Sequence, residues 1–113
     1  MKRRRAARAK CRVYVIELHN EVLTERKFLK ENPRRDPKKP CLYVGSTCLS
    51  PRERFRNHLR GQHGNPFVYR YGIRLRPDLY RHYPPLTREE AELTERELAL
   101  ELRAKGYGVW FNV

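Results

Sequence analysis

The sequence predicts a small α+β domain in which helices flank a three-stranded sheet. Three segments combine β-branched and aromatic residues in the manner of strands, and two others carry the start and stop signals of helices. The predicted strands are residues 11–18, 41–45 and 109–113, and the predicted helices are residues 51–60 and 88–104. A chain of 113 residues has room for one domain with one modest core. We therefore expect a single folded unit over residues 11–113.

Each predicted strand carries a polar or aromatic residue that is a candidate for a site. In the first strand, alternation places Tyr14 on the same face as Arg12. In the second, Tyr43 is followed by Gly45, which ends the strand. The last strand contains Asn112. Taken singly, each of these residues is ordinary in a strand.

Both predicted helices have clear beginnings and ends. A polar N-cap residue is followed three positions later by a glutamate, which forms a capping box, and a glycine follows the last turn. These residues are Ser50, Glu53 and Gly61 for the first helix, and Thr87, Glu90 and Gly106 for the second. Pro51 suits the first position of the first helix.

Two side-chain stripes run along the first helix. Phe55 and Leu59 are four residues apart and form the expected buried stripe. Arg54 and His58, also four apart, lie beside it. A lone histidine is most often a surface residue, and His58 gains interest because it lies one turn after Arg54.

The second helix places a carboxylate on an apolar face. At 100° per residue, Glu95 shares a narrow face with Ala91 and Leu98. A carboxylate is expensive to bury unless something binds it, so Glu95 is the candidate acidic residue. Glu97 is the reserve candidate, because it lies on a second, semi-apolar face. Three other glutamates near it are expected at the surface, namely Glu90, Glu92 and Glu101.

Two segments between these elements are less regular. Residues 19–40 are basic and proline-containing and predict an insertion, with a short helix over Glu21–Lys30 and an exposed loop over Asn32–Pro40. Phe67–Tyr71 and Leu79–Tyr83 are each compatible with a short strand or a packed loop.

The charge predicts a polyanionic partner. Lys and Arg number 26 against 13 Asp and Glu, which gives a net charge of +13 and a pI near 10.2. Such a protein attracts nucleic acid first and an anionic membrane surface second. Residues 1–10 hold six of the basic side chains and predict a flexible arm that follows phosphates. On charge alone, a non-catalytic binder is as good an interpretation as an enzyme.

The cysteines and the hydropathy bound the compartment. Three cysteines without a CxxC pair argue against both a disulfide scaffold and a zinc ribbon. Free thiols predict a reducing cytoplasm, with nucleoid association if the protein is bacterial. No stretch approaches the roughly 20 apolar residues of a membrane helix, so we expect no membrane partner.

The ordered set of motifs resembles the GIY-YIG nuclease superfamily over about residues 11–113. Arg12-Val13-Tyr14 stands in the place of G-I-Y and Tyr43-Val44-Gly45 in that of Y-I-G. The R-x-x-x-H spacing of Arg54 and His58 follows on a capped helix, and Glu95 and Asn112 complete the set. The resemblance implies a stand-alone catalytic domain with a mainly antiparallel sheet, and a metal-dependent DNA endonuclease. It implies that the catalytic residues are Tyr14, Tyr43, Arg54, His58, Glu95 and Asn112.

Phosphodiester hydrolysis gives these residues distinct roles. Glu95 would anchor Mg²⁺ (or Mn²⁺), whose other ligands are water and the substrate phosphate. Arg54 would clamp that phosphate in a bidentate manner. Tyr14 is the candidate general base, and Tyr43 and His58 would position the water or relay its proton. Which of these three accepts the proton stays open. Asn112 would support the site by hydrogen bonding.

The chain also departs from the family. Arg12 replaces a glycine, and Ser46 stands where some members carry a lysine. No separate DNA-reading domain is expected, so single-stranded, duplex or branched DNA is bound with little sequence preference. RNA stays open, as does a protein partner for targeting. The alternatives are a non-catalytic nucleic-acid-binding protein that keeps the fold, and a nuclease subunit active only with a partner. The expected nucleic-acid contacts are Arg12, Arg34, Arg35, Lys38, Lys39, Arg52, Arg56 and Arg60.

Overall fold

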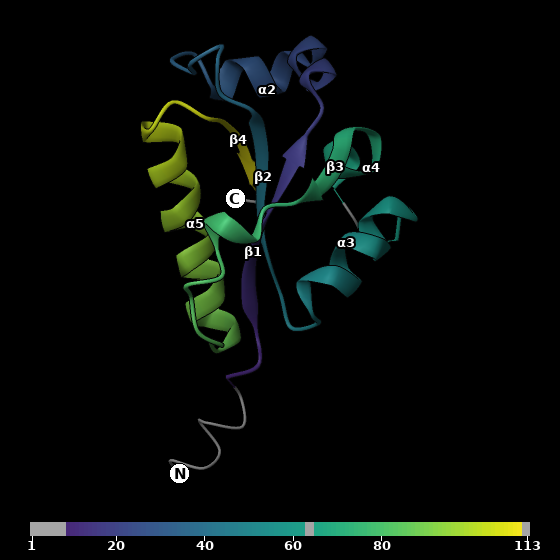
Figure 1. The fold of residues 1–113 in the computed structure, drawn as a ribbon, viewed down its shortest axis with the longest axis vertical. Helices are drawn as coiled ribbons and strands as arrows, with labels where there is room; N and C mark the ends of the chain where they lie inside the picture. Colours follow the sequence, from purple (N-terminus) through teal and green to yellow (C-terminus); the bar gives the residue numbers. More distant parts are fainter. Residues whose placement is uncertain (1–8, 63–64, 112–113) are drawn as a thin grey trace.

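A mixed sheet of four strands, in the order β3-β1-β2-β4, forms the centre of the part of the chain that the structure describes (Figure 1). This computed structural model describes residues 9–62 and 65–111. The central strands β1 and β2 are antiparallel, β3 is antiparallel to β1, and β4 is parallel to β2. The strands are β1 (Arg12–Leu18), β2 (Cys41–Thr47), β3 (Gly72–Leu75) and β4 (Gly108–Phe111).

The α+β class is confirmed, but the predicted three-stranded sheet is wrong in strand number. The missed strand β3 has only four residues, and its two middle side chains are exposed. It therefore lacks the apolar alternation that marks a strand in a sequence. The parallel pairing of β4 with β2 follows from the long helix before β4, since a parallel pair needs such a crossover connection.

Helices cover both faces of the sheet (Figure 1). The long helix α5 (Arg88–Ala104) packs on β2 and β4, whereas α3 (Pro51–Leu59) and α4 (Pro66–Tyr71) pack near β1 and β3. Because β1 is covered on both faces, its residues 13–16 are all buried rather than alternately exposed. No helix in the described ranges is long and apolar enough to cross a membrane.

Both predicted N-caps are confirmed, but the capping box predicted at Ser50 is only half formed, because the Ser50 hydroxyl itself donates to the Glu53 carboxylate at 3.2 Å. The hydroxyl of Ser50 accepts the backbone N–H of Glu53, and Thr87 and Glu90 form a complete capping box. Gly61 and Gly106 follow the two helices with φ values of 74° and 103°, a conformation that glycine adopts without steric cost.

Other local predictions need correction. Leu59 is 45% exposed, and His58 is the buried residue of α3. Phe67–Tyr71 lies in the helix α4, because Asn65 caps its N-terminus and Pro66 starts it. Leu79 ends a short 3-10 helix, Pro77–Leu79, so residues 79–83 form no strand.

The first part of the basic segment 19–40 packs into the core, whereas residues 33–40 form the loop that the sequence predicts, with Asn32 buried instead of exposed. The first part contains a 3-10 helix, Asn20–Thr24, and the helix α2 (Arg26–Glu31), whose Phe28 is fully buried. The buried amide of Asn32 donates to the Val109 carbonyl at 3.0 Å and accepts the Val109 N–H at 2.8 Å. This side chain therefore ties the segment to β4.

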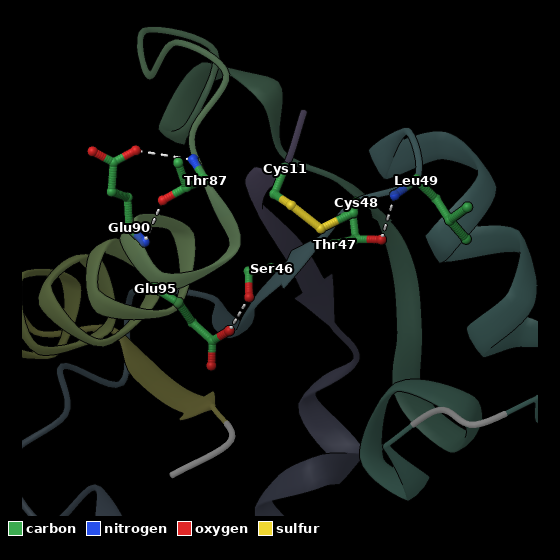
Figure 2. Close-up of a disulfide and its surroundings, with 8 residues drawn as sticks. All are labelled: Cys11, Ser46, Thr47, Cys48, Leu49, Thr87, Glu90 and Glu95. Carbon is green, nitrogen blue, oxygen red and sulfur yellow. Dashed lines mark hydrogen bonds between the residues drawn. A yellow bond between two sulfur atoms is a disulfide. The ribbon is translucent and has the colours of Figure 1, made fainter. Parts of the chain in front are cut away.

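The expectation of free thiols is wrong for two of the three cysteines. A disulfide joins Cys11 to Cys48 (Figure 2). Extending the β1–β2 register by one residue beyond the Arg12–Thr47 pair brings the two cysteines opposite each other. Cys41 stays a buried free thiol. Only one of the three cysteines on which the expectation of a reducing cytoplasm was based is therefore a free thiol.

We expect Cys48→Ser to lower the free energy of unfolding by about 4 kcal/mol, because the disulfide closes a loop of sequence separation 37. Urea denaturation with and without dithiothreitol measures this. Reductant should bring the unmodified protein to the stability of Cys48→Ser and leave the variant unchanged. Equal stability of the unmodified protein with and without reductant would contradict a stabilising Cys11–Cys48 disulfide.

Candidate active site

The register of β1 and β2 places Tyr14 opposite Gly45. A Cβ atom at residue 45 would lie 2.6 Å from the Tyr14 hydroxyl and 2.9 Å from the Tyr43 ring. Real Cβ contacts are never this short, so the tyrosine cluster requires glycine at this position. The space taken up by the two tyrosines therefore explains why Gly45 ends the Tyr43-Val44-Gly45 motif.

Tyr14, Tyr43 and His58 form one buried aromatic cluster. Their exposed fractions are 1%, 1% and 0%. The Tyr14 hydroxyl lies 2.8 Å from His58 Nε2, and the Tyr43 and His58 rings meet edge to face at 5.5 Å between centroids. Residues 44 positions apart in the chain are thus joined by a buried hydrogen bond.

The backbone fixes which nitrogen of His58 carries the hydrogen. The Asn65 N–H donates to His58 Nδ1 at 3.3 Å. A neutral imidazole has one N–H and one acceptor nitrogen, so its hydrogen lies on Nε2. His58 therefore donates to the Tyr14 oxygen, and the Tyr14 hydrogen points elsewhere.

Burial holds the cluster in its neutral form. It raises the pKa of Tyr14 well above its ordinary value, and the charges of Tyr43 and Glu95 add to this rise. Arg54 opposes the rise through its charge and a hydrogen bond to Tyr14. Burial, with a smaller contribution from Arg54, lowers the pKa of His58 to about 4. At neutral pH, both the phenol and the imidazole are uncharged.

Arg54 lies at the edge of this cluster. It is half-buried, one turn before His58 on α3, and its guanidinium donates to the Gln62 carbonyl at 3.3 Å. Its charge lowers the pKa of both Tyr14 and His58. A guanidinium in this position can bind a phosphate and favour the phenolate form of Tyr14.

Glu95 is the buried carboxylate that helix geometry predicts. Its exposed fraction is 6%, and it lies on the buried face of α5 with Ala91 and Leu98. The Ser46 hydroxyl donates to Glu95 Oε1 at 2.8 Å (Figure 2). Glu97, the reserve candidate, is exposed on the same helix. Burial thus favours Glu95 over Glu97 as the candidate acidic residue of the site.

Ser46 is a site residue that the sequence did not reveal. Side chains alternate along a strand, so Ser46 points away from the face that carries Tyr43. It meets α5 on the opposite face and binds Glu95 there. Glu95 remains close enough for its charge to raise the pKa of Tyr14. The tyrosine cluster and Glu95 therefore lie on opposite faces of β2, beside the neighbouring residues Gly45 and Ser46.

A cleft of about 450 Å³ opens beside Glu95. Cys11 and the end of β2 form one wall, and α5 forms the other. Besides Glu95, its lining comprises Cys11, Ser46, Thr47, Cys48, Arg88, Ala91, Glu92 and Arg96. Glu92, expected only at the surface, thus shares this cleft.

The oxygen donors of this cleft fit magnesium or manganese. Glu95 supplies a carboxylate, and Ser46, whose hydroxyl donates to it, lines the same cleft. Mg²⁺ typically binds one or two carboxylates and keeps several waters and substrate oxygens as its other ligands. No cluster of three or more His, Cys, Asp or Glu side chains is placed to hold a metal among residues 9–62 and 65–111. The fit is therefore to an ion anchored by one residue.

Comparison with known proteins gives no relative. No protein-family model, no curated protein and no solved structure matches this chain. The chemistry of the site therefore rests on its own residues.

The predicted basic contacts fall into two groups. Arg12, at the start of β1, and Arg52, Arg56 and Arg60, on and just after α3, are exposed near the cluster. The others, Arg34, Arg35, Lys38 and Lys39, precede β2 at the opposite end of the sheet. There, Lys39 donates to the Lys105 carbonyl at the end of α5.

Two sequence predictions cannot be compared with the structure. Asn112, the last predicted catalytic residue, lies outside the described residues. Most of the predicted basic arm does too, since the description begins at residue 9. The structure thus brings together five of the six predicted catalytic residues, namely Tyr14, Tyr43, Arg54, His58 and Glu95.

His58 should make stability depend on pH. Its pKa is about 4 in the folded protein and 6.5 ordinarily, so the unfolded chain binds its proton first as pH falls. The stabilisation is complete above pH 6.5, and roughly 2–3 kcal/mol is lost by pH 4. Urea denaturation of the unmodified protein and of His58→Gln across this range isolates the effect. Parallel pH profiles for the two proteins would refute the prediction.

Proposed function

We propose that this protein is a metal-dependent endonuclease that hydrolyses phosphodiester bonds in DNA, as its resemblance to the GIY-YIG superfamily implies. One observation carries the proposal. A phenol, an imidazole, a guanidinium and a carboxylate come from three separate elements, β1, α3 and α5, and act on one another, centred on the 2.8 Å contact between Tyr14 and His58. A tyrosine that merely packs in a strand would need no imidazole, guanidinium or carboxylate beside it.

The charge of the chain supports a nucleic-acid substrate. A net charge of +13 favours binding to the phosphate backbone, and such binding reads little sequence. We therefore propose low sequence specificity, on single-stranded, duplex or branched DNA.

In the proposed reaction, Tyr14 receives the proton of the attacking water. Its own proton must first pass to solvent water, since it cannot go to His58, whose Nε2 already carries a hydrogen. The Nε2–H donor and the Arg54 charge both favour the resulting phenolate. His58 is thus a positioning residue that stabilises the base, and Tyr14 is the proton acceptor.

The other groups act on the phosphate. Arg54 binds a phosphoryl oxygen while the water oxygen bonds to phosphorus and the bond to the leaving oxygen breaks. Magnesium or manganese held at Glu95 would neutralise the phosphoryl oxygens and assist the departing oxyanion. Ser46 holds one oxygen of Glu95 in place through its hydrogen bond.

Glu95→Gln should abolish cleavage and preserve binding. We expect cleavage to fall at least about 100-fold, because losing the metal anchor removes several kcal/mol of transition-state stabilisation. Single-stranded, duplex and branched DNA are incubated with Mg²⁺, Mn²⁺ or EDTA, and products are resolved on denaturing gels. Glu97→Gln is the matched control, since it removes the same charge from an exposed site on α5.

The same assay separates the alternatives. If the pure protein cuts no DNA with any metal but binds it in a salt-dependent way, it is a non-catalytic binder. If cleavage arises only after a cell extract is added, and requires Glu95, it is a subunit that needs a partner. If Glu97→Gln fails and Glu95→Gln cuts, the acidic residue is assigned wrongly.

Tyr14→Phe tests the proton acceptor. Losing a general base typically costs about 10²–10⁴-fold in rate, and we expect this loss in kcat. Tyr80→Phe serves as control, because Tyr80 is also a buried tyrosine but is not one of the three residues of the Tyr14–Tyr43–His58 cluster. Single-turnover kinetics with saturating protein measures the chemical step. A Tyr14→Phe protein as fast as Tyr80→Phe would exclude Tyr14 as the base.

A further inference from the structure

The cleft beside Glu95 is larger than one phosphate group needs. Its volume of about 450 Å³ falls in the range of roughly 300–1,000 Å³ that holds multi-atom ligands. It is bounded by the end of β2, by the Cys11–Cys48 disulfide and by the first turns of α5 (Figure 2). There is room for more of a substrate than the bond that is cut.

Two arginines of this cleft have no carboxylate partner within residues 9–62 and 65–111. Arg88 and Arg96 line it and are exposed. Glu92 lies four residues from each and would pair with either at the usual helical spacing. Yet neither arginine forms an ion pair within 4.0 Å among the residues that the structure describes. By contrast, Arg70, Arg74 and Arg76 all pair with carboxylates.

The positions of the arginines define a direction along α5. Arg96 follows Glu95 directly, whereas Arg88 is the first residue of the helix, roughly 12 Å from Arg96 along the helix axis at 1.5 Å per residue. The positive end of the helix dipole lies at Arg88 and favours anions there. Cys11, which follows the basic residues 1–10, lies in the wall opposite α5.

We infer that this cleft binds the nucleic-acid strand on one side of the bond that is cut, with Arg96 and Arg88 each contacting a flanking phosphate. The position of this strand relative to a cleaved bond rests on the proposed function, whereas the binding of a strand in the cleft does not. The strand leaves Glu95 along α5 toward its N-terminus. The Glu92 carboxylate between the arginines disfavours a phosphate at its own position, which spaces the two contacts.

The test compares single charge removals inside and outside the cleft. Arg88→Gln and Arg96→Gln are measured against Arg26→Gln, an exposed arginine at the start of α2. Binding of a labelled oligothymidylate is followed by fluorescence anisotropy in EDTA at several NaCl concentrations. Each cleft variant should weaken Kd about fivefold and lower the slope of log K against log salt by about 0.7, the value of one phosphate contact on a single strand. Arg26→Gln should change neither quantity.

The outcomes separate this inference from the proposed enzyme. Equal effects of all three substitutions would overturn the cleft as a strand site, even if the protein cuts DNA. If the protein cuts nothing with Mg²⁺ or Mn²⁺ while only the cleft variants lose binding, the enzyme proposal fails and the strand site stands. Thermal melting of each variant confirms that these exposed substitutions leave the fold intact.

Discussion

The close approach of the Tyr14 ring to the backbone of Gly45 determines how the site is built. It exists because β1 and β2 pair in the one register that places these residues opposite each other. A slip of one residue would turn every side chain of a strand to the other face, which would bring Tyr14 away from His58. The pairing that makes the sheet is therefore also the pairing that makes the aromatic cluster.

The site combines groups whose charges oppose one another. Burial favours neutral Tyr14 and neutral His58, while Arg54 favours the phenolate and Glu95 disfavours it. An electrostatic balance of this kind is sensitive to any added charge, because the buried surroundings screen it little. A phosphate or a divalent cation beside Glu95 would thus change the protonation of a residue on the other face of the strand.

The sequence predicts this site better than it predicts the sheet. Glu95 and the two helix N-caps follow from helical periodicity and local capping chemistry, which are encoded within a few residues. The strand β3 and the role of Ser46 depend on pairing with residues far away in the chain, and no local pattern reports such pairing. The disulfide was missed for the same reason, since only the strand register brings Cys11 to Cys48.

The buried amide of Asn32 gives the segment 19–40 a mechanical role. Its oxygen accepts from both Val109 and Arg103, and its nitrogen donates to Phe28 and Val109. The segment therefore holds the last strand in place instead of hanging from the surface. Grafting a different recognition loop between β1 and β2 would remove this anchor. Changes that alter nucleic-acid binding through this segment are thus confined to exposed side chains such as Arg34 and Lys38, whose replacement leaves the backbone in place.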